Sequence, residues 1–213
     1  ERTQNHKDIE VVLAPTHLHL QPLSLQIDHR KFKLAAQNAY HKDEGAYTGE
    51  VSYTMLRHLV SYGLVGHSER RHIFNESLDE ITLKVAAAYR NGITPILCVG
   101  ETKIDRLSKE TNQVLHDQVV SALANVTSEE VQSIVIAYEP VWAIGTGENA
   151  KPSDVASVAR VIKHDITELY GTKAAERVRI LYGGSVTADT ASGYLRLPEI
   201  DGLLVGGASL NYH

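Results

Sequence analysis

The chain alternates short, nearly continuous apolar runs with longer amphipathic segments, and this alternation restricts its fold more than any other feature. Strands that are apolar along their whole length are buried on both faces, as in a parallel sheet covered by helices. The sequence therefore predicts an α/β fold. The apolar runs number about seven and are VVLA from Val11, KLAAQN from Lys33, GLVG from Gly63, TPILCVG from Thr94, SIVIAYE from Ser133, VRILYGG from Val178 and GLLVGG from Gly202.

The amphipathic segments contain the residues with which helices commonly begin and end. In the segment from Ser77 to Gly92, Ser77 suits an N-cap with Glu80 three residues later, and Gly92 suits the helix end. A second helix is expected to begin at Pro152 or Ser153 and to stop at Gly171.

Two closures of a parallel sheet compete, an open doubly wound sheet and a (β/α)8 barrel. No G-x-G-x-x-G motif follows the first strand, and polar residues follow several different strands, which favours the barrel. Such barrels typically have roughly 250 residues, whereas this chain has 213, begins with polar ERTQNHKDIE and stops soon after its last strand. We therefore expect residues 1–213 to form a single TIM (β/α)8 barrel domain that lacks its first strand and last helix.

The composition excludes several classes of function. A formal charge of -5 with scattered basic residues argues against a nucleic-acid partner, and no apolar stretch is long enough to cross a membrane. The single cysteine, Cys98, cannot form an intrachain disulfide, and no secretory apolar region precedes the first strand. We therefore expect a cytoplasmic protein.

Glu139 stands where the apolar run IVIAYE ends. At the rim of a buried strand its carboxylate would be partly removed from water, which makes a carboxylate a stronger base. An isolated glutamate in such a place is more often an ion-pair partner. Here Pro140 begins the loop PVWAIGTG, whose apolar residues and flexible Gly-Thr-Gly suit a lid over a site. The lid favours a catalytic interpretation.

His67 occupies a comparable position in LVGHSERR, directly after a strand and before Ser68, a good N-cap. The positive end of a helix dipole would lower the pKa of His67 and keep the imidazole neutral, so that it can donate a hydrogen bond to a carbonyl oxygen. The alternative is a structural histidine that caps a turn. Glu69 and Arg70 would form a solvated helix start or an ion-pair network that supports the site.

Two glycine pairs follow the last two strands, YGGS from Tyr182 and VGGAS from Val205. Glycines let backbone N–H groups approach an anion closely, and a short helix after Gly207 would direct its dipole there. Barrels often bind a phosphate between the loops after their final two strands. With Gly145 in the preceding loop, these pairs predict a phosphate site, although either pair alone would indicate only a tight turn.

A metal site is not expected. His17 and His19 are spaced for one face of a strand, His67 and His72 are not four residues apart, and one cysteine cannot supply a thiolate cluster. Cys98 lies within TPILCVG and is interpreted as a small buried strand residue rather than as a nucleophile.

Six stretches together resemble the triosephosphate isomerase family: YEPVWAIGTG, VGHSERR, GAYTGEVS, ILCVGE, LYGGSV and LLVGGASL. The similarity extends in order from Val11 to Leu210. It implies interconversion of dihydroxyacetone phosphate and D-glyceraldehyde 3-phosphate through an enediolate, without a cofactor. Glu139 would shuttle the proton between the two carbons and His67 would polarise the carbonyl, roles for which this family is the standard example and which are carried over from it.

The resemblance also implies the remaining site residues. Backbone contacts of Gly145, Ser185, Gly206 and Gly207 would hold the phosphate. The loop from Pro140 to Thr146 would close as a lid, with Tyr182 and Ser185 placed to latch it. The family is dimeric, and AYHKDEGAYTGEVS resembles the loop that inserts into the neighbouring subunit, where Thr48 would approach the partner's site.

One family feature has no counterpart in the sequence. Family members begin with a strand that ends in an Asn-x-Lys motif, and no such motif occurs here; Lys103 and Lys109 fall in a helical segment elsewhere. A truncated, catalytically impaired barrel that acts as a scaffold is therefore an alternative to an isomerase. Another sugar-phosphate isomerase or an aldolase would require a different base or a lysine at a strand end.

Overall fold

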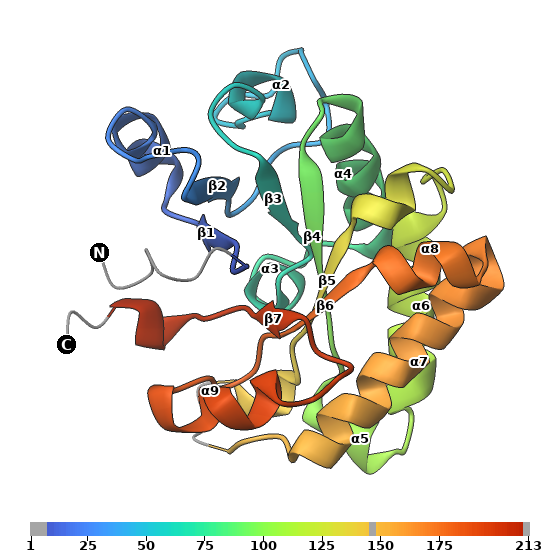
Figure 1. Cartoon of the computed structure of the whole chain (residues 1–213). Coiled ribbons are helices and arrows are strands. Elements are labelled where there is room, and N and C mark those ends of the chain that lie inside the picture. The colour runs from blue at the N-terminus through green and yellow to red at the C-terminus, as the bar shows by residue number, and fades with distance from the viewer. Residues whose placement is uncertain (1–7, 145–147, 211–213) are drawn as a thin grey trace.

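The computed structural model describes residues 8–144 and 148–210 and contains seven strands in one parallel sheet (Figure 1). Each strand pairs with the next one along the chain, so that Val65 lies opposite Leu97 and Val99 opposite Tyr138. This sequential order is that of a (β/α) barrel, because a doubly wound sheet reverses its order partway. The predicted fold class is confirmed. The strands are β1 (Val11–Leu13), β2 (Phe32–Ala36), β3 (Tyr62–Val65), β4 (Thr94–Val99), β5 (Val135–Tyr138), β6 (Arg179–Tyr182) and β7 (Gly202–Leu203).

The helices lie between successive strands and cover the outside of the curled sheet. Figure 1 shows α4, α6, α7 and α8 gathered on one side of it, and α4 packs on β3 and β4, α6 on β4 and α7 on β5. The helices are α1 (His17–Ser24), α2 (Tyr53–Leu56), α3 (Ser68–His72), α4 (Leu78–Arg90), α5 (Lys103–Leu107), α6 (Thr111–Leu123), α7 (Pro152–Tyr170), α8 (Thr172–Arg177) and α9 (Ala188–Leu195), with 3-10 turns η1 (Glu130–Ser133), η2 (Val141–Ala143) and η3 (Gly207–Leu210).

Successive residues of the central strands enter two separate apolar clusters. In β4, Ile96 and Cys98 point to the inner cluster and Leu97 and Val99 to the outer one. This follows from the two-residue period of a strand. The inner cluster fills the interior of the sheet and consists of Ala35, Tyr62, Leu64, Ile96, Cys98, Val135 and Ala137, with Val12, Ala14, Leu181 and Leu204 packed against it.

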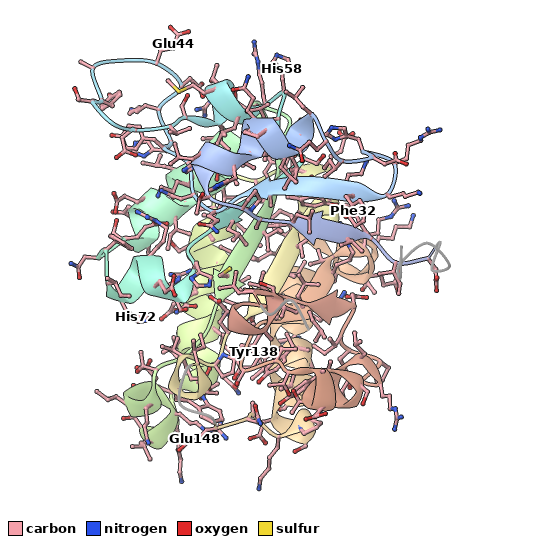
Figure 2. The ribbon with its side chains drawn as sticks, turned by 90° about the vertical axis from the view of Figure 1, so that its left-hand side faces the viewer. Phe32, Glu44, His58, His72, Tyr138 and Glu148 are labelled. Atoms are coloured by element: carbon pink, nitrogen blue, oxygen red, sulfur yellow. The ribbon has the colours of Figure 1, made fainter. Side chains whose placement is uncertain are left out.

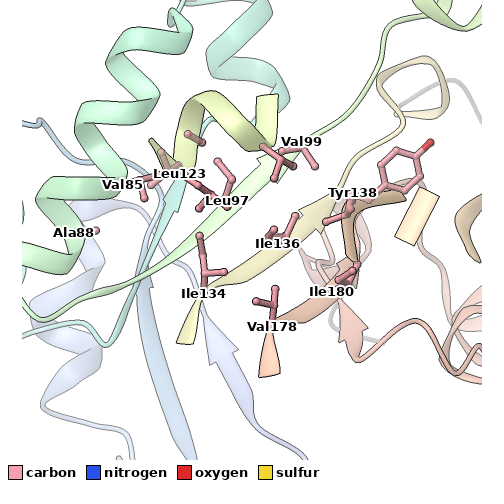
Figure 3. Packing of buried hydrophobic residues seen from close by; sticks show 14 of the residues in the cluster. Val85, Ala88, Leu97, Val99, Leu123, Ile134, Ile136, Tyr138, Val178 and Ile180 are labelled. Carbon is pink, nitrogen blue, oxygen red and sulfur yellow. The ribbon is translucent and has the colours of Figure 1, made fainter. Parts of the chain in front are cut away.

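The outer cluster joins the sheet to its helices. Figure 3 shows Leu97 and Val99 of β4 close to Leu123 of α6, with Ile136 of β5 beside them. All four side chains are at most 1% exposed. Because both faces of the strands are buried in this way, nearly every strand residue must be apolar, which explains the runs seen in the sequence.

The predicted helix boundaries hold for α4 and α7. The Ser77 hydroxyl accepts the Glu80 N–H at 3.2 Å, and the Glu80 carboxylate accepts the Ser77 N–H at 2.9 Å, which completes a capping box. Gly92, just beyond α4, has φ of 70°. Pro152 is the first residue of α7, and Gly171, with φ of 85°, ends it.

The strand placement of His17 and His19 is wrong, because both lie in α1. The alternation of histidine and leucine resembles a strand period, but only Leu20 of this stretch is buried, whereas Leu18 is 87% exposed. The chain must cross from the end of β1 back to the start of β2, and a helix packed on β2 makes this connection.

A pH-sensitive contact joins α6 to α7. His116 Nδ1 lies 3.0 Å from Asp165 Oδ1; the aspartate is buried, whereas the histidine side chain is 49% exposed. The hydrogen bond to Asp165 raises the pKa of His116, with burial opposing the shift. A raised folded-state pKa contributes stability that is fully present below the unfolded value of about 6.5 and is lost as the pH rises through the folded value.

We therefore expect His116→Asn to lower the free energy of unfolding more at pH 5.5 than at pH 9. Because the His116 side chain is about half exposed, solvent screens the contact, and the difference should not exceed about 1 kcal/mol. Urea denaturation of both proteins at the two pH values measures it. An equal cost at both would show that the pair carries no pH-dependent stability.

Candidate active site

Glu139 directly follows β5 and is held against β3 and β4. Its backbone N–H donates to the carbonyl of Val99 at 2.8 Å, which continues the β4–β5 ladder by one residue. Its side chain is only 3% exposed, and Oε2 accepts the backbone N–H of Ser68 at 3.0 Å. The carboxylate that was predicted from the end of an apolar run is therefore buried and aimed at the loop after β3.

His67 follows β3 and lies against this carboxylate. Its Nε2 is 2.9 Å from Oε1 of Glu139, and its Nδ1 accepts the backbone N–H of Glu69 at 3.3 Å. Because a backbone N–H can only donate, Nδ1 is unprotonated in this contact and the ring proton is on Nε2. Nε2–H therefore donates to Glu139, so both ring nitrogens of the imidazole have a hydrogen-bond partner.

The expected depression of the pKa of His67 is wrong. Burial lowers the pKa and is the largest single effect, but the hydrogen bond and negative charge of Glu139, with the charge of Glu69, outweigh it, so the pKa lies above its ordinary value. The prediction rested only on the helix that follows His67. The contact with Glu139, which comes from a distant part of the chain, cannot be seen in the sequence.

The residues around His67 differ in part from their predicted roles. His67 itself, not Ser68, is the N-cap of α3, and Ser68 is the buried first residue whose N–H reaches Glu139. Glu69 is exposed, with its carboxylate 3.8 Å from Nδ1 of His67. Arg70 does enter an ion-pair network, but its partner is the buried Glu76, which Lys84 also contacts at 2.9 Å. Glu76 was not among the residues predicted from the sequence.

Tyr182 is fully buried beneath the rim. It ends β6 on the outer face, where its ring stacks on Tyr194 at 4.0 Å between ring centroids. The Tyr194 hydroxyl donates to the carbonyl of Ala150, just beyond the predicted lid. Burial raises the pKa of Tyr182. The glycine after it, Gly183, borders the site, because a Cβ there would lie 3.1 Å from Cγ of Glu139.

The predicted phosphate residues follow the adjacent strands β6 and β7. Ser185 is partly buried, whereas Gly206 and Gly207 are exposed, with no atom within 4 Å of a Cβ built on either. The short helix expected after Gly207 is a four-residue 3-10 turn, η3, whose Ser209 bonds back to the carbonyl of Gly206. Gly145 lies outside the described residues.

Glu101, a buried carboxylate that was not predicted from the sequence, holds the start of the predicted lid. It accepts the indole N–H of Trp142 at 2.8 Å and the hydroxyl of Tyr138 at 3.1 Å, and its carbonyl accepts the N–H of Val141. The guanidinium of Arg106 covers the Trp142 ring at 4.4 Å. Burial raises the pKa of Glu101. Its position two residues after the end of β4 was the available sequence signal.

A shallow pocket of about 340 Å³ lies beside Trp142 and Arg106, at the start of the predicted lid, and Glu139 does not line it. Lys103, which belongs to α5, contributes to it and so does not lie among the catalytic candidates. The pocket is lined by Lys103, Arg106, Leu107, Lys109, Trp142 and Glu148.

The loop that contains Thr48 projects from the barrel between β2 and α2. Figure 2 shows Glu44 at its outer end, well away from Tyr138. A bridge between Tyr40 and Ser52 closes the base of the loop, and Tyr47 packs on Tyr40 with 4.8 Å between ring centroids. The loop is therefore closed by its own contacts, and Thr48 is exposed to solvent on it.

The described residues contain neither a metal-binding cluster nor a membrane-spanning helix. No group of three or more His, Cys, Asp or Glu side chains there is arranged to hold a metal ion. None of the helices described has the length and apolar character that crossing a membrane requires. Cys98 is buried, as predicted, and burial raises the pKa of its thiol well above the ordinary value.

A parallel (β/α) barrel with a buried carboxylate and an imidazole joined at the carboxyl ends of its strands has the architecture of the barrel enzymes. Comparison with known proteins identifies which. The sequence model of the family described as triosephosphate isomerase matches residues 1–213. The chain belongs to the triosephosphate isomerase family and is an isomerase.

Curated relatives from distant organisms match most of the chain, and all three described here are named triosephosphate isomerase. One from Caldanaerobacter subterraneus subsp. tengcongensis is 46% identical over 94% of this chain and 82% of its own length. One from Dictyoglomus turgidum is 44% identical over 99% of this chain and 85% of its own. One from Dictyostelium discoideum is also 44% identical, over 99% and 82%.

Proposed function

We propose that this protein interconverts dihydroxyacetone phosphate and D-glyceraldehyde 3-phosphate through an enediolate, without a cofactor. The observation that carries the proposal is the 2.9 Å contact between His67 Nε2 and Glu139 Oε1 in a chain of this family. The reaction needs one group that removes a proton from carbon and one that stabilises the oxygen of the adjacent carbonyl. A carboxylate and an imidazole N–H side by side supply both.

Glu139 is the proposed base. Its carboxylate takes the proton from the carbon next to the carbonyl, the electron pair of the broken C–H bond moves into the enediolate, and the same proton returns to the neighbouring carbon. His67 donates its Nε2 hydrogen bond to the carbonyl oxygen and moves protons between the two oxygens. No atom is gained or lost, so the reaction requires no further reactant.

The substrate must separate the pair before it can react. Nε2 of His67 has a single hydrogen to donate, and without substrate that hydrogen is directed to Glu139. When a carbonyl oxygen takes it, the carboxylate is released to face the adjacent carbon. The contact that raises the pKa of His67 is then lost and burial again favours the neutral ring, which is the form predicted from the sequence.

The phosphate group is proposed to lie at the ends of β6 and β7. Gly206 and Gly207 have open space where side chains would otherwise stand, so their backbone N–H groups can approach an anion. Ser185 and Gly145 complete the set. The loop from Pro140 to Thr146 would close over the substrate, with Tyr182 and Ser185 as its latch, and would exclude water; this family is itself a standard example of such closure.

The active protein is proposed to be a cytoplasmic homodimer of glycolysis and gluconeogenesis. Two folded loops that carry Thr48, one from each subunit, would insert beside the end of the partner's α3. Just after this helix, Ile73 and Phe74 are 67% and 63% exposed. Exposed apolar residues of this size gain stability when an interface covers them. Sedimentation at micromolar concentration should give a mass of two chains, and a monomer with full activity would contradict this arrangement.

An assay of the purified protein tests the function. Each triose phosphate is supplied in turn, and the appearance of the other is followed by coupling to a dehydrogenase that acts only on the product. We expect turnover in both directions without added metal. A folded protein that turns over neither triose phosphate would overturn the proposal and would support the scaffold alternative.

A further inference from the structure

The side chain and the backbone of Arg71, in α3, both form hydrogen bonds next to His67. Its Nε donates to the carbonyl of Gly66 at 2.7 Å, directly before the histidine. Its own backbone N–H donates to the carbonyl of His67 at 3.1 Å. The peptide groups on both sides of the imidazole's Cα are therefore bound by one residue.

Gly66 is shaped for this guanidinium. Its φ of 68° lies in the left-handed region that favours glycine, and a Cβ there would stand 2.8 Å from a terminal nitrogen of Arg71 and 3.0 Å from Ile81. A side chain at this position would displace the guanidinium. The glycine in VGHSERR thus admits the arginine as well as making the turn.

The same guanidinium reaches the next strand. Its Nη2 donates to the carbonyl of Cys98 at 2.8 Å, just past the point where β3 ends opposite Leu97. The following residue, Val99, accepts the backbone N–H of Glu139. One rigid, planar group therefore connects the strand end that carries His67 to the strand end that holds Glu139.

We propose that Arg71 is a positioning residue for the reaction, which sets the distance between the imidazole of His67 and the carboxylate of Glu139 by tying the ends of β3 and β4 together. This inference rests on the proposed function. The guanidinium forms its hydrogen bonds with backbone carbonyls and none with either side chain of the pair, so it acts through the backbone. Its charge also interacts with that of Glu139, and burial lowers its own pKa.

Arg71→Lys is the sharpest variant, because a lysine keeps the positive charge but cannot donate in two fixed directions. Arg160→Lys is the matched control; it changes an arginine whose guanidinium meets Glu199 on the surface between α7 and the loop after α9. Two quantities are measured, the kcat and KM of isomerisation and the ¹⁵N chemical shifts of the His67 ring in labelled protein.

We expect Arg71→Lys to lower kcat about tenfold or more, because a displacement of about 1 Å in a catalytic group can cost about 100-fold. KM should change less than kcat, and the ¹⁵N shifts of His67 should move, whereas Arg160→Lys should alter neither. An unchanged kcat with unmoved His67 resonances would overturn the proposal. So would a loss of folding in both Arg71→Lys and Arg71→Gln, which would assign the arginine to the framework of the barrel.

The two readouts also separate this proposal from the proposed function. If the unsubstituted protein isomerises neither triose phosphate, the function fails. The His67 chemical shifts in Arg71→Lys would then still decide whether the guanidinium positions that ring, because they require no turnover.

Discussion

Glu139→Asp should lower kcat by about 100- to 1,000-fold while KM changes little. The substitution withdraws the carboxylate by about 1.5 Å, the length of one carbon–carbon bond, so it can no longer reach both Ser68 N–H and His67 Nε2, now at 3.0 and 2.9 Å. A misplacement of about 1 Å costs up to about 100-fold, and a general base contributes up to about 10,000-fold. Since the charge is kept, substrate binding should survive.

Steady-state kinetics in both directions measure this effect. Glu168→Asp is the matched control, because Glu168 is an exposed residue in the last turn of α7 and is distant in sequence from Glu139. Glu139→Gln complements both variants, because it keeps the length of the side chain and removes the base. A Glu139→Asp protein whose kcat stays within about threefold of the original would remove Glu139 from the proposed role.

The strands and several helix ends could be predicted because they depend on short-range patterns. Apolar runs fixed by burial on both faces located all seven strands, and Ser77 with Glu80 located the start of α4. The boundaries shifted where pairing decides them: the run from Lys33 begins at Phe32, and the last run keeps only Gly202 and Leu203 in the sheet. His17 and His19 were misplaced because local alternation does not reveal which side chain is buried.

The site could be predicted residue by residue but not as an arrangement. Glu139 and His67 were found because each closely follows the end of a strand. Their contact, and hence the direction of the pKa of His67, depends on β3, β4 and β5 being neighbours with a particular register. Arg71 could not be identified from the sequence, because its guanidinium donates to two backbone carbonyls, and every residue has a backbone carbonyl.

Gly100, directly after β4, packs against the backbone of Glu139. A Cβ at this position would lie 1.7 Å from the backbone carbonyl oxygen of Glu139 and 2.6 Å from its carbonyl carbon. The backbone of Gly100 is held in place by the side-chain amide of Gln118, which accepts the Gly100 N–H at 2.8 Å and donates to the Gly100 carbonyl at 3.1 Å. A methyl group must therefore separate the ends of β4 and β5.

Gly100→Ala should accordingly destabilise the protein by about 3 kcal/mol or more, the upper end of what overpacking costs, and lower kcat/KM about 100-fold by moving the base about 1 Å. Gly193→Ala is the matched control: nothing lies within 4 Å of a Cβ there, and in the helix α9 alanine should stabilise by about 0.5–1 kcal/mol. Urea unfolding and steady-state kinetics of the two variants give both quantities. If Gly100→Ala were as stable and as active as Gly193→Ala, the close approach of Gly100 to Glu139 would not be what fixes the base at the rim.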